Sequence, residues 1–203
     1  MQLLVCVMRT LLLGRKQMDS LHSQLWRDLP KQDWDVISTT KAIAQRHGIT
    51  PTSESRGFWR GIEQRIEELH AARRESHRAR LLYVLSLLFT ELPPRRNAEW
   101  QSMKMGNMKR NAIDSSNIHF RKFKSVLRDG HIQMPHSFFS EKLMRAMRLY
   151  MAAHPRLKHE GAFLLCSEDG EPFRKINSLT RLLYSALGCC SADLRRYWFQ
   201  RFT

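Results

Sequence analysis

The stretch Arg80–Trp100, RLLYVLSLLFTELPPRRNAEW, decides the fold, because it places a long apolar run directly before a double proline and two arginines. The apolar run is too continuous for a helix with a solvated face and too short for a membrane span, so we expect a helix buried on several sides. Pro93 and Pro94 cannot continue that helix, since proline lacks an N–H donor and its ring clashes one turn back. The sequence therefore predicts a rigid turn that presents Arg95 and Arg96 at the end of a core helix.

The charge of the chain points to a polyanionic partner. Its 203 residues include 34 Lys and Arg against 19 Asp and Glu, a formal net charge of +15 with a pI near 10.3. Residues 1–90 have 14 basic and 9 acidic side chains, residues 91–135 have 9 basic and 4 acidic ones, and residues 136–203 have 11 basic and 6 acidic ones. Each part therefore has the same positive excess. This even distribution fits a folded domain that grips nucleic acid better than a basic localisation tail. Positive charge alone is shared with ribosomal, chromatin and membrane-surface proteins.

The length and a hydrophobic content of 42% suffice for one substantial core. Four cysteines lack the spacing of a metal-binding motif, and adjacent cysteines rarely bridge each other: Cys6, Cys166, Cys189 and Cys190. We therefore expect a reducing, intracellular setting with no metal and no small-molecule cofactor. Arg9 interrupts the apolar start of the chain and no convincing cleavage site follows, so we expect neither a signal peptide nor a membrane partner.

Hydrophobic periodicity predicts a mostly helical chain. A weakly patterned helical region ends at Gly48, an amphipathic helix begins at Ser53 or Ser55, and a short helix follows Arg96. Further amphipathic helices are predicted from Ser137 or Ser140 to His154, over Leu179–Leu187 with a cap at Gly188, and from an N-cap at Ser191. Trp59 lies at helical spacing beside the apolar residues of the second helix, so we expect it in the core and not as a base-stacking aromatic.

A small antiparallel sheet is predicted between these helices. Ile118 and Phe120 alternate with polar residues, and the turn signal Asp129-Gly130 precedes a second alternating segment at residues 132–134. This hairpin carries a basic rim: Arg121, Lys122, Lys124 and Arg128. Residues 162–166, AFLLC, predict a short buried strand. The expected fold class is α+β and mostly helical.

The order of these pieces resembles the catalytic domain of the tyrosine recombinase (phage integrase) family, from its first conserved box into its second. Thr90–Glu99 resembles the first box, in the variant with prolines before an arginine that is followed three positions later by a carboxylate. The later pieces then follow in the family's order: a basic hairpin, a Phe-Leu-Leu strand with an Asp-Gly-Glu-Pro turn, a helix, and Leu194-Arg-Arg at a helix start. The resemblance covers residues 53–203 and implies a DNA breaking-rejoining domain. Residues 1–52 would be a short helical arm, a remnant of the DNA-clamping domain that recombinases carry there.

The resemblance also implies roles for individual residues. Arg96 and Arg195 take the places of the two catalytic arginines, whose planar guanidinium groups bind the non-bridging oxygens of the scissile phosphate. Lys124 takes the place of the general-acid lysine, with Lys122 as the alternative; a plain phosphate contact by Lys124 is the competing interpretation. The remaining basic residues are expected to contact DNA: Arg95, Arg121, Lys122, Arg128 and Arg196.

Two departures from the family bear on activity. Ala192 stands where the second box usually has a histidine, and Arg196 cannot act as a base at neutral pH. The family's nucleophilic tyrosine lies downstream of the second box, whereas this sequence stops at Thr203; Tyr197 points about 200° around the helix from Arg195 and is no substitute.

We therefore expect a recombinase-like protein that binds duplex DNA and is inactive alone. Other recombinase protomers are the expected partners if a tyrosine is supplied from another chain. The alternative is a non-catalytic basic helical protein that binds DNA or RNA or acts as a scaffold.

Overall fold

The apolar run before the double proline forms the central helix α4 (His77–Thr90) of the computed structural model. The structure describes residues 36–93, 95–106, 111–114, 117–121, 132–135, 139–175 and 177–201. The Oγ of Ser76 caps α4 by accepting a hydrogen bond from the N–H of Ala79 at 3.1 Å. Every residue from Leu81 to Thr90 is buried, and α4 contacts three other long helices, α3, α6 and α7. The predicted helix buried on several sides is confirmed.

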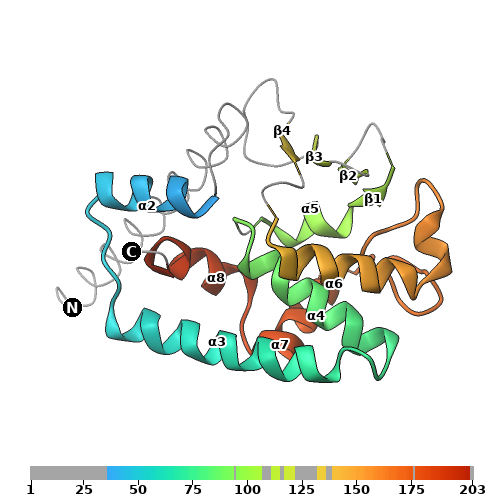
Figure 1. Cartoon of the computed structure of the whole chain (residues 1–203), viewed down its shortest axis with the longest axis horizontal. Helices are drawn as coiled ribbons and strands as arrows, with labels where there is room; N and C mark the ends of the chain where they lie inside the picture. Colours follow the sequence, from blue (N-terminus) through green and yellow to red (C-terminus); the bar gives the residue numbers. More distant parts are fainter. Residues whose placement is uncertain are drawn as a thin grey trace, which may run out of the picture.

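Several of the other helices pack against α4 (Figure 1). The helices are α2 (Val36–Arg46), α3 (Ser53–Ala72), α5 (Asn97–Gln101), α6 (Glu141–Ala152), α7 (Ser178–Leu187) and α8 (Ser191–Tyr197), with the 3₁₀ turns η3 (Pro155–Lys158) and η4 (Trp198–Arg201). The strands are β1 (Lys104–Met105), β2 (Ala112–Ile113), β3 (Asn117–Phe120) and β4 (Ile132–Pro135). Figure 1 shows the sheet beside α5, at the edge of the helical body. The described part of the chain is therefore mostly helical with a small sheet, as the α+β prediction requires.

The sheet is mixed, whereas the sequence predicts an antiparallel one. Its strand order is β1-β2-β3-β4, and β3 pairs antiparallel with β4 so that Ile118 lies opposite Met134. The predicted hairpin strands are thus present, while the predicted turn at Asp129-Gly130 lies outside the described residues. The parallel pair is β1 with β2, in which Lys104 lies opposite Ala112. Two-residue strands show no alternation, so sequence periodicity could not reveal this pair.

The strand predicted for residues 162–166 is not formed. Phe163 makes one isolated antiparallel bridge with Lys104, and Cys166 makes another with Pro172. Leu164, Leu165 and Cys166 are nevertheless buried, so the apolar pattern correctly indicated burial. The start of the segment pairs with the chain around β1: the N–H of Leu164 donates to the carbonyl of Met103 at 3.0 Å, and the N–H of Met105 donates to the carbonyl of Ala162 at 2.8 Å. This pairing is limited to a single bridge, so no strand is formed over residues 162–166.

Helix α3 begins one residue away from its predicted start. Thr52 is the N-cap, since its Oγ1 accepts from the N–H of Ser55 at 3.1 Å and the Oγ of Ser55 accepts from the N–H of Thr52 at 3.0 Å. Ser53, one of the two predicted caps, is the first helical residue. Ser140, one of the two residues predicted to start α6, is its cap and accepts from the N–H of Leu143 at 3.0 Å.

Helix α8 also starts with an unpredicted cap. The N-cap is Cys190 and not Ser191, because the Asp193 carboxylate reaches back to accept from the N–H of Cys190 at 3.0 Å. The preceding helix α7 ends as predicted at Gly188, whose φ of 71° is in the left-handed region that favours glycine. This turn brings α8, with its two arginines, back toward α4.

Both ends of the described chain meet at η4. Helices α2 and α3 contact η4, and Ile43 and Ala44 of α2 belong to the same apolar core as α4. The indole of Trp59 is buried as predicted and donates to the carbonyl of Tyr197 at 3.0 Å, a contact between residues 138 positions apart. None of the helices in the described ranges has the length and apolar character to cross a bilayer.

Candidate nucleic-acid interface

The double arginine after α4 has one buried and one exposed member. Arg95 is 5% exposed, and its Nε lies 2.7 Å from Oε2 of Glu99, which is 4% exposed. The guanidinium also lies over the ring of Phe120 on β3, 5.0 Å from the ring centroid. Arg96 is exposed. The predicted turn therefore places the guanidinium of Arg95 inside the protein and leaves that of Arg96 on the surface.

Glu99 holds both arginines in place. Its carboxylate pairs with the side chain of Arg95 and accepts a hydrogen bond from the backbone N–H of Arg96 at 3.3 Å, as the N3 residue of α5. Burial raises the pKa of the Glu99 carboxyl, and the nearby Arg95 charge opposes that rise. Because a guanidinium stays protonated at any physiological pH, Arg95 presents a permanent positive charge to the Glu99 carboxyl.

Arg195 comes to the same place from the other end of the described chain. Burial lowers the pKa of Arg95, Glu99 opposes that effect, and the positive charges of Arg96 and Arg195 lower the pKa further. Both arginines are thus close enough for their charges to act on Arg95. Arg195 is partly exposed and lies on α8, about 100 residues after Arg96 in the sequence. The structure gathers three arginines here, which we call the arginine cluster: Arg95, Arg96 and Arg195.

Helix α5 is fixed against the segments that lead to α8. The Nδ2 of Asn97 donates to Oγ1 of Thr180 on α7 at 2.8 Å, and the Nε2 of Gln101 donates to the carbonyls of Phe173 and Lys175 at 3.0 and 3.1 Å. Trp100 is fully buried between these contacts. Arg96 therefore projects from a helix whose position is set by buried and hydrogen-bonded neighbours.

The other predicted site residues are distributed as follows. Arg121 directly follows β3 and is partly exposed; its N–H donates to Oδ1 of Asn111 at 2.9 Å. The Nδ2 of Asn111 in turn donates to the carbonyl of Glu99 at 3.2 Å, which links the end of β3 to the arginine cluster. Arg196 is exposed on α8. The predictions for Lys122, Lys124 and Arg128 lie outside the described residues.

The tyrosines differ in their accessibility. Tyr83, Tyr150 and Tyr197 are buried, and Tyr184 on α7 is 54% exposed. The hydroxyl of Tyr197 donates to the carboxylate of Glu54, and its ring packs against Phe58 at 4.8 Å between centroids. Burial and this hydrogen bond raise the pKa of Tyr197. A buried phenol with a raised pKa and a hydrogen-bonded proton is a poor nucleophile.

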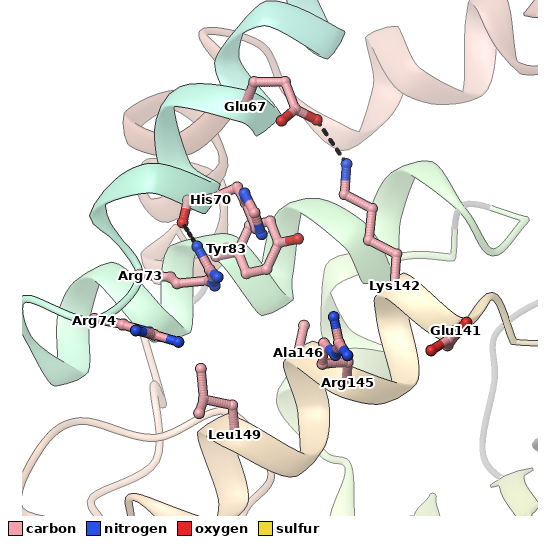
Figure 2. A pocket seen from close by; sticks show the side chains of 10 residues that line it. All are labelled: Glu67, His70, Arg73, Arg74, Tyr83, Glu141, Lys142, Arg145, Ala146 and Leu149. Atoms are coloured by element: carbon pink, nitrogen blue, oxygen red, sulfur yellow. Dashed lines mark hydrogen bonds and ion pairs between the residues drawn. The ribbon is translucent and has the colours of Figure 1, made fainter.

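A second basic feature is a pocket of about 710 Å³ between α3, α4 and α6 (Figure 2). Its charged lining residues are the bases Arg73, Arg74, Lys142 and Arg145 and the acids Glu67 and Glu141. Lys142 pairs with Glu67 at 2.8 Å, and the guanidinium of Arg73 donates to the carbonyl of His70. The sequence analysis missed this pocket, because its residues come from helices 70 positions apart. The available signal was the basic spacing of residues 142 and 145, which share one face of α6.

Two titratable rings of this pocket are perturbed. Burial raises the pKa of Tyr83 to about 12. Burial lowers the pKa of His70, as do the charges of Arg73, Lys142 and Arg145, while Glu67 raises it. The ring centroids of His70 and Tyr83 are 5.4 Å apart. At neutral pH both rings are therefore uncharged, and the pocket's positive charge comes from its arginines and Lys142.

One group of described residues has donor atoms close enough to hold a metal ion: His77, His154 and Cys166. It lies at the first residue of α4, whereas the arginine cluster follows the last turn of that helix.

Comparison with known proteins found no matching family model, no significantly similar curated protein and no significantly similar solved structure.

Proposed function

We propose that this chain is a recombinase-like DNA-binding protein that grips a backbone phosphate of duplex DNA through Arg96 and Arg195. The observation that carries the proposal is that the positive charges of Arg96 and Arg195 both act on the buried Arg95, which is paired with Glu99. In this proposal Arg95 positions the turn and does not touch DNA, because its guanidinium is 5% exposed. Arg121 and Arg196 contact neighbouring phosphates from the end of β3 and from α8.

Electrostatics supports a polyanion at this place. Like charges held together by the fold repel one another, and that cost is offset when a phosphate enters between them. Guanidinium groups arriving from two directions suit the two non-bridging oxygens of a phosphodiester, each of which accepts charge-assisted hydrogen bonds. The net charge of +15 would add long-range attraction to the DNA.

The proposal assigns binding and not strand cleavage to these 203 residues. Cleavage by the recombinase route needs a tyrosine that forms a covalent phosphodiester link. Tyr197 is buried and hydrogen-bonded to Glu54, and Ala192 offers no proton-transfer group beside Arg195. In this proposal Tyr197 is therefore not a nucleophile, and the arginines stabilise a bound phosphate without cleaving it.

Fluorescence anisotropy with a labelled duplex tests the binding. The logarithm of the affinity should fall linearly with the logarithm of the salt concentration, with a slope of about 0.9 per phosphate neutralised. Arg96→Ala should weaken binding about tenfold and reduce the slope by about one, because it removes one phosphate contact. Arg96→Lys retains the charge but cannot make bidentate hydrogen bonds to the phosphate, so its DNA affinity should lie between those of Arg96→Ala and the wild type.

Arg65→Ala is the matched control, since Arg65 is an exposed α3 residue paired with Glu68 at 3.0 Å and its loss changes the net charge equally. It should bind like the wild type. Equal losses in Arg96→Ala and Arg65→Ala would show that only net charge matters and would overturn the assigned interface. A covalent adduct between the wild-type chain and a nicked suicide duplex would instead contradict the assignment of binding without cleavage.

A further inference from the structure

The start of α4, the end of α6 and the turn after residue 165 bring two imidazoles and a thiol together. His77, His154 and Cys166 are 6%, 4% and 1% exposed, and one potential ligand atom from each lies within 4.8 Å of the other two. The ring centroids of the two histidines are 4.8 Å apart. These residues come from positions 89 apart in the sequence and lie far from the arginine cluster along α4, so the proposed DNA contacts do not use them.

The hydrogen bonds around the two imidazoles select which nitrogen of each is left for a ligand. The Nε2 of His77 lies 3.0 Å from the carbonyl oxygen of Cys166, and the Nε2 of His154 lies 2.9 Å from that of Glu168. A carbonyl only accepts, so each Nε2 carries the proton, and in a neutral imidazole the lone pair is then on Nδ1. The Nδ1 of His154 is buried and has no hydrogen-bond partner among the described residues. A buried ring nitrogen without a partner costs free energy, which a bound cation would remove.

We propose that His77 Nδ1, His154 Nδ1 and Cys166 Sγ bind a zinc ion that ties these three segments together. Imidazole nitrogen and thiolate sulfur form a ligand set that zinc accepts in tetrahedral sites. With bonds of about 2.1 Å to nitrogen and about 2.3 Å to sulfur, tetrahedral ligands lie about 3.5 Å apart. The three side chains already offer ligand atoms within 4.8 Å of one another, and binding would draw the ligands closer to the tetrahedral separation. A water molecule completes the tetrahedron.

The surroundings provide the outer hydrogen bonds of a zinc site. Metal-bound histidines usually donate their second N–H to a carbonyl or carboxylate, as both imidazoles here are placed to do. The hydroxyl of Tyr150 lies 3.8 Å from Cys166 Sγ and donates to the thiolate once the metal is bound. The turn that carries Cys166 and Glu168 is fixed to η3, because Arg156 donates to the carbonyl of Asp169.

Zinc binding displaces the thiol proton. Burial raises the pKa of Cys166, so the thiol is neutral without a metal, and formation of the Zn–S bond releases one proton to solvent. The imidazoles lose none, since each Nδ1 is already unprotonated in the tautomer above.

Metal titration of the purified full chain tests the site. Co²⁺ should bind in a 1:1 ratio and give a sulfur-to-metal charge-transfer band, and Zn²⁺ should displace it. Cys166→Ser should abolish the band, and His154→Gln should weaken Co²⁺ binding at least tenfold. Cys189→Ser is the matched control, since Cys189 is also buried but lies outside the cluster, and it should retain both the band and the affinity.

Thermal unfolding gives a second measurement. Zinc should raise the melting temperature of the wild type and of Cys189→Ser, but not of Cys166→Ser or His154→Gln. If Cys166→Ser does not fold, the response of His154→Gln to zinc tests the site instead, because this variant keeps the thiol of Cys166. A wild-type chain that binds no Co²⁺ at micromolar protein concentration would overturn the site. So would a charge-transfer band that persists in Cys166→Ser.

Discussion

Replacing Glu99 with glutamine removes the carboxylate that pairs with Arg95 while keeping an oxygen that can accept from the N–H of Arg96. The two side chains are 5% and 4% exposed and their closest atoms lie 2.7 Å apart. For charge centres about 4 Å apart and an effective dielectric constant of about 20, the lost attraction is about 4 kcal/mol. Measured losses for breaking one side of a buried ion pair are about 3–5 kcal/mol. We therefore expect Glu99→Gln to lower the free energy of unfolding by about 3 kcal/mol.

Urea unfolding followed by tryptophan fluorescence measures this loss, since Trp100 is buried on the same helix. Glu67→Gln breaks the exposed Glu67–Lys142 pair and is the control, with an expected loss below about 1 kcal/mol. The double variant Arg95→Met/Glu99→Gln leaves no buried charge of this pair. It should be less destabilised than the sum of its single variants by about 2 kcal/mol.

The dependence on pH gives an independent check. Burial raises the pKa of Glu99 and Arg95 holds it down, so Arg95→Met should raise that pKa further. A carboxyl whose pKa is higher in the folded than in the unfolded state favours folding below the unfolded-state pKa. That contribution is lost as the pH rises through the folded-state pKa. Arg95→Met should thus be destabilised more at pH 7 than at about pH 4. A loss below about 1 kcal/mol in Glu99→Gln, or additive single variants, would refute the reasoning.

Two further predictions concern His70 and Tyr197. In an NMR titration the pKa of His70 should lie below that of a free histidine. Arg73→Gln should raise this pKa and Glu67→Gln should lower it. If both variants shifted the pKa of His70 in the same direction, the charges described around this ring would be wrong. Tyr197→Phe loses the hydrogen bond to Glu54, so it should cost about 1 kcal/mol in urea unfolding yet leave DNA affinity unchanged. A loss of DNA binding in correctly folded Tyr197→Phe would show that the hydroxyl belongs to the interface.

Local sequence signals predicted much of the fold. The unbroken apolar run defined α4, Gly188 ended α7, and Ser140 started α6, because each is governed by neighbours within about four positions. The predicted N-cap was wrong where the side chain at the third helical position determines which residue is the cap. In α8 the carboxylate of Asp193 makes Cys190 the N-cap. The missing strand at residues 162–166 depends on a partner that no local pattern specifies.

The candidate sites were harder to predict, for the same reason. Two adjacent arginines look equivalent in sequence, and only the tertiary contacts with Glu99 and Phe120 bury Arg95 and leave Arg96 exposed. The cluster of His77, His154 and Cys166 has no short spacing that a motif could capture, because its members are on three separate segments. The pairing of Arg96 with Arg195 came from the resemblance to the recombinase family, and their joint contact with one phosphate stays a prediction.

The bond from Trp59 to the carbonyl of Tyr197 has a consequence for the order of folding. Closing a loop of 138 residues costs the unfolded chain about 4 kcal/mol of entropy, more than one hydrogen bond returns. The contact becomes favourable only after the helices between these residues have shortened that loop. We therefore expect docking of α3 on the end of α8 to be a late, long-range step, of the kind that makes folding slower than in a bundle of sequence-neighbouring helices.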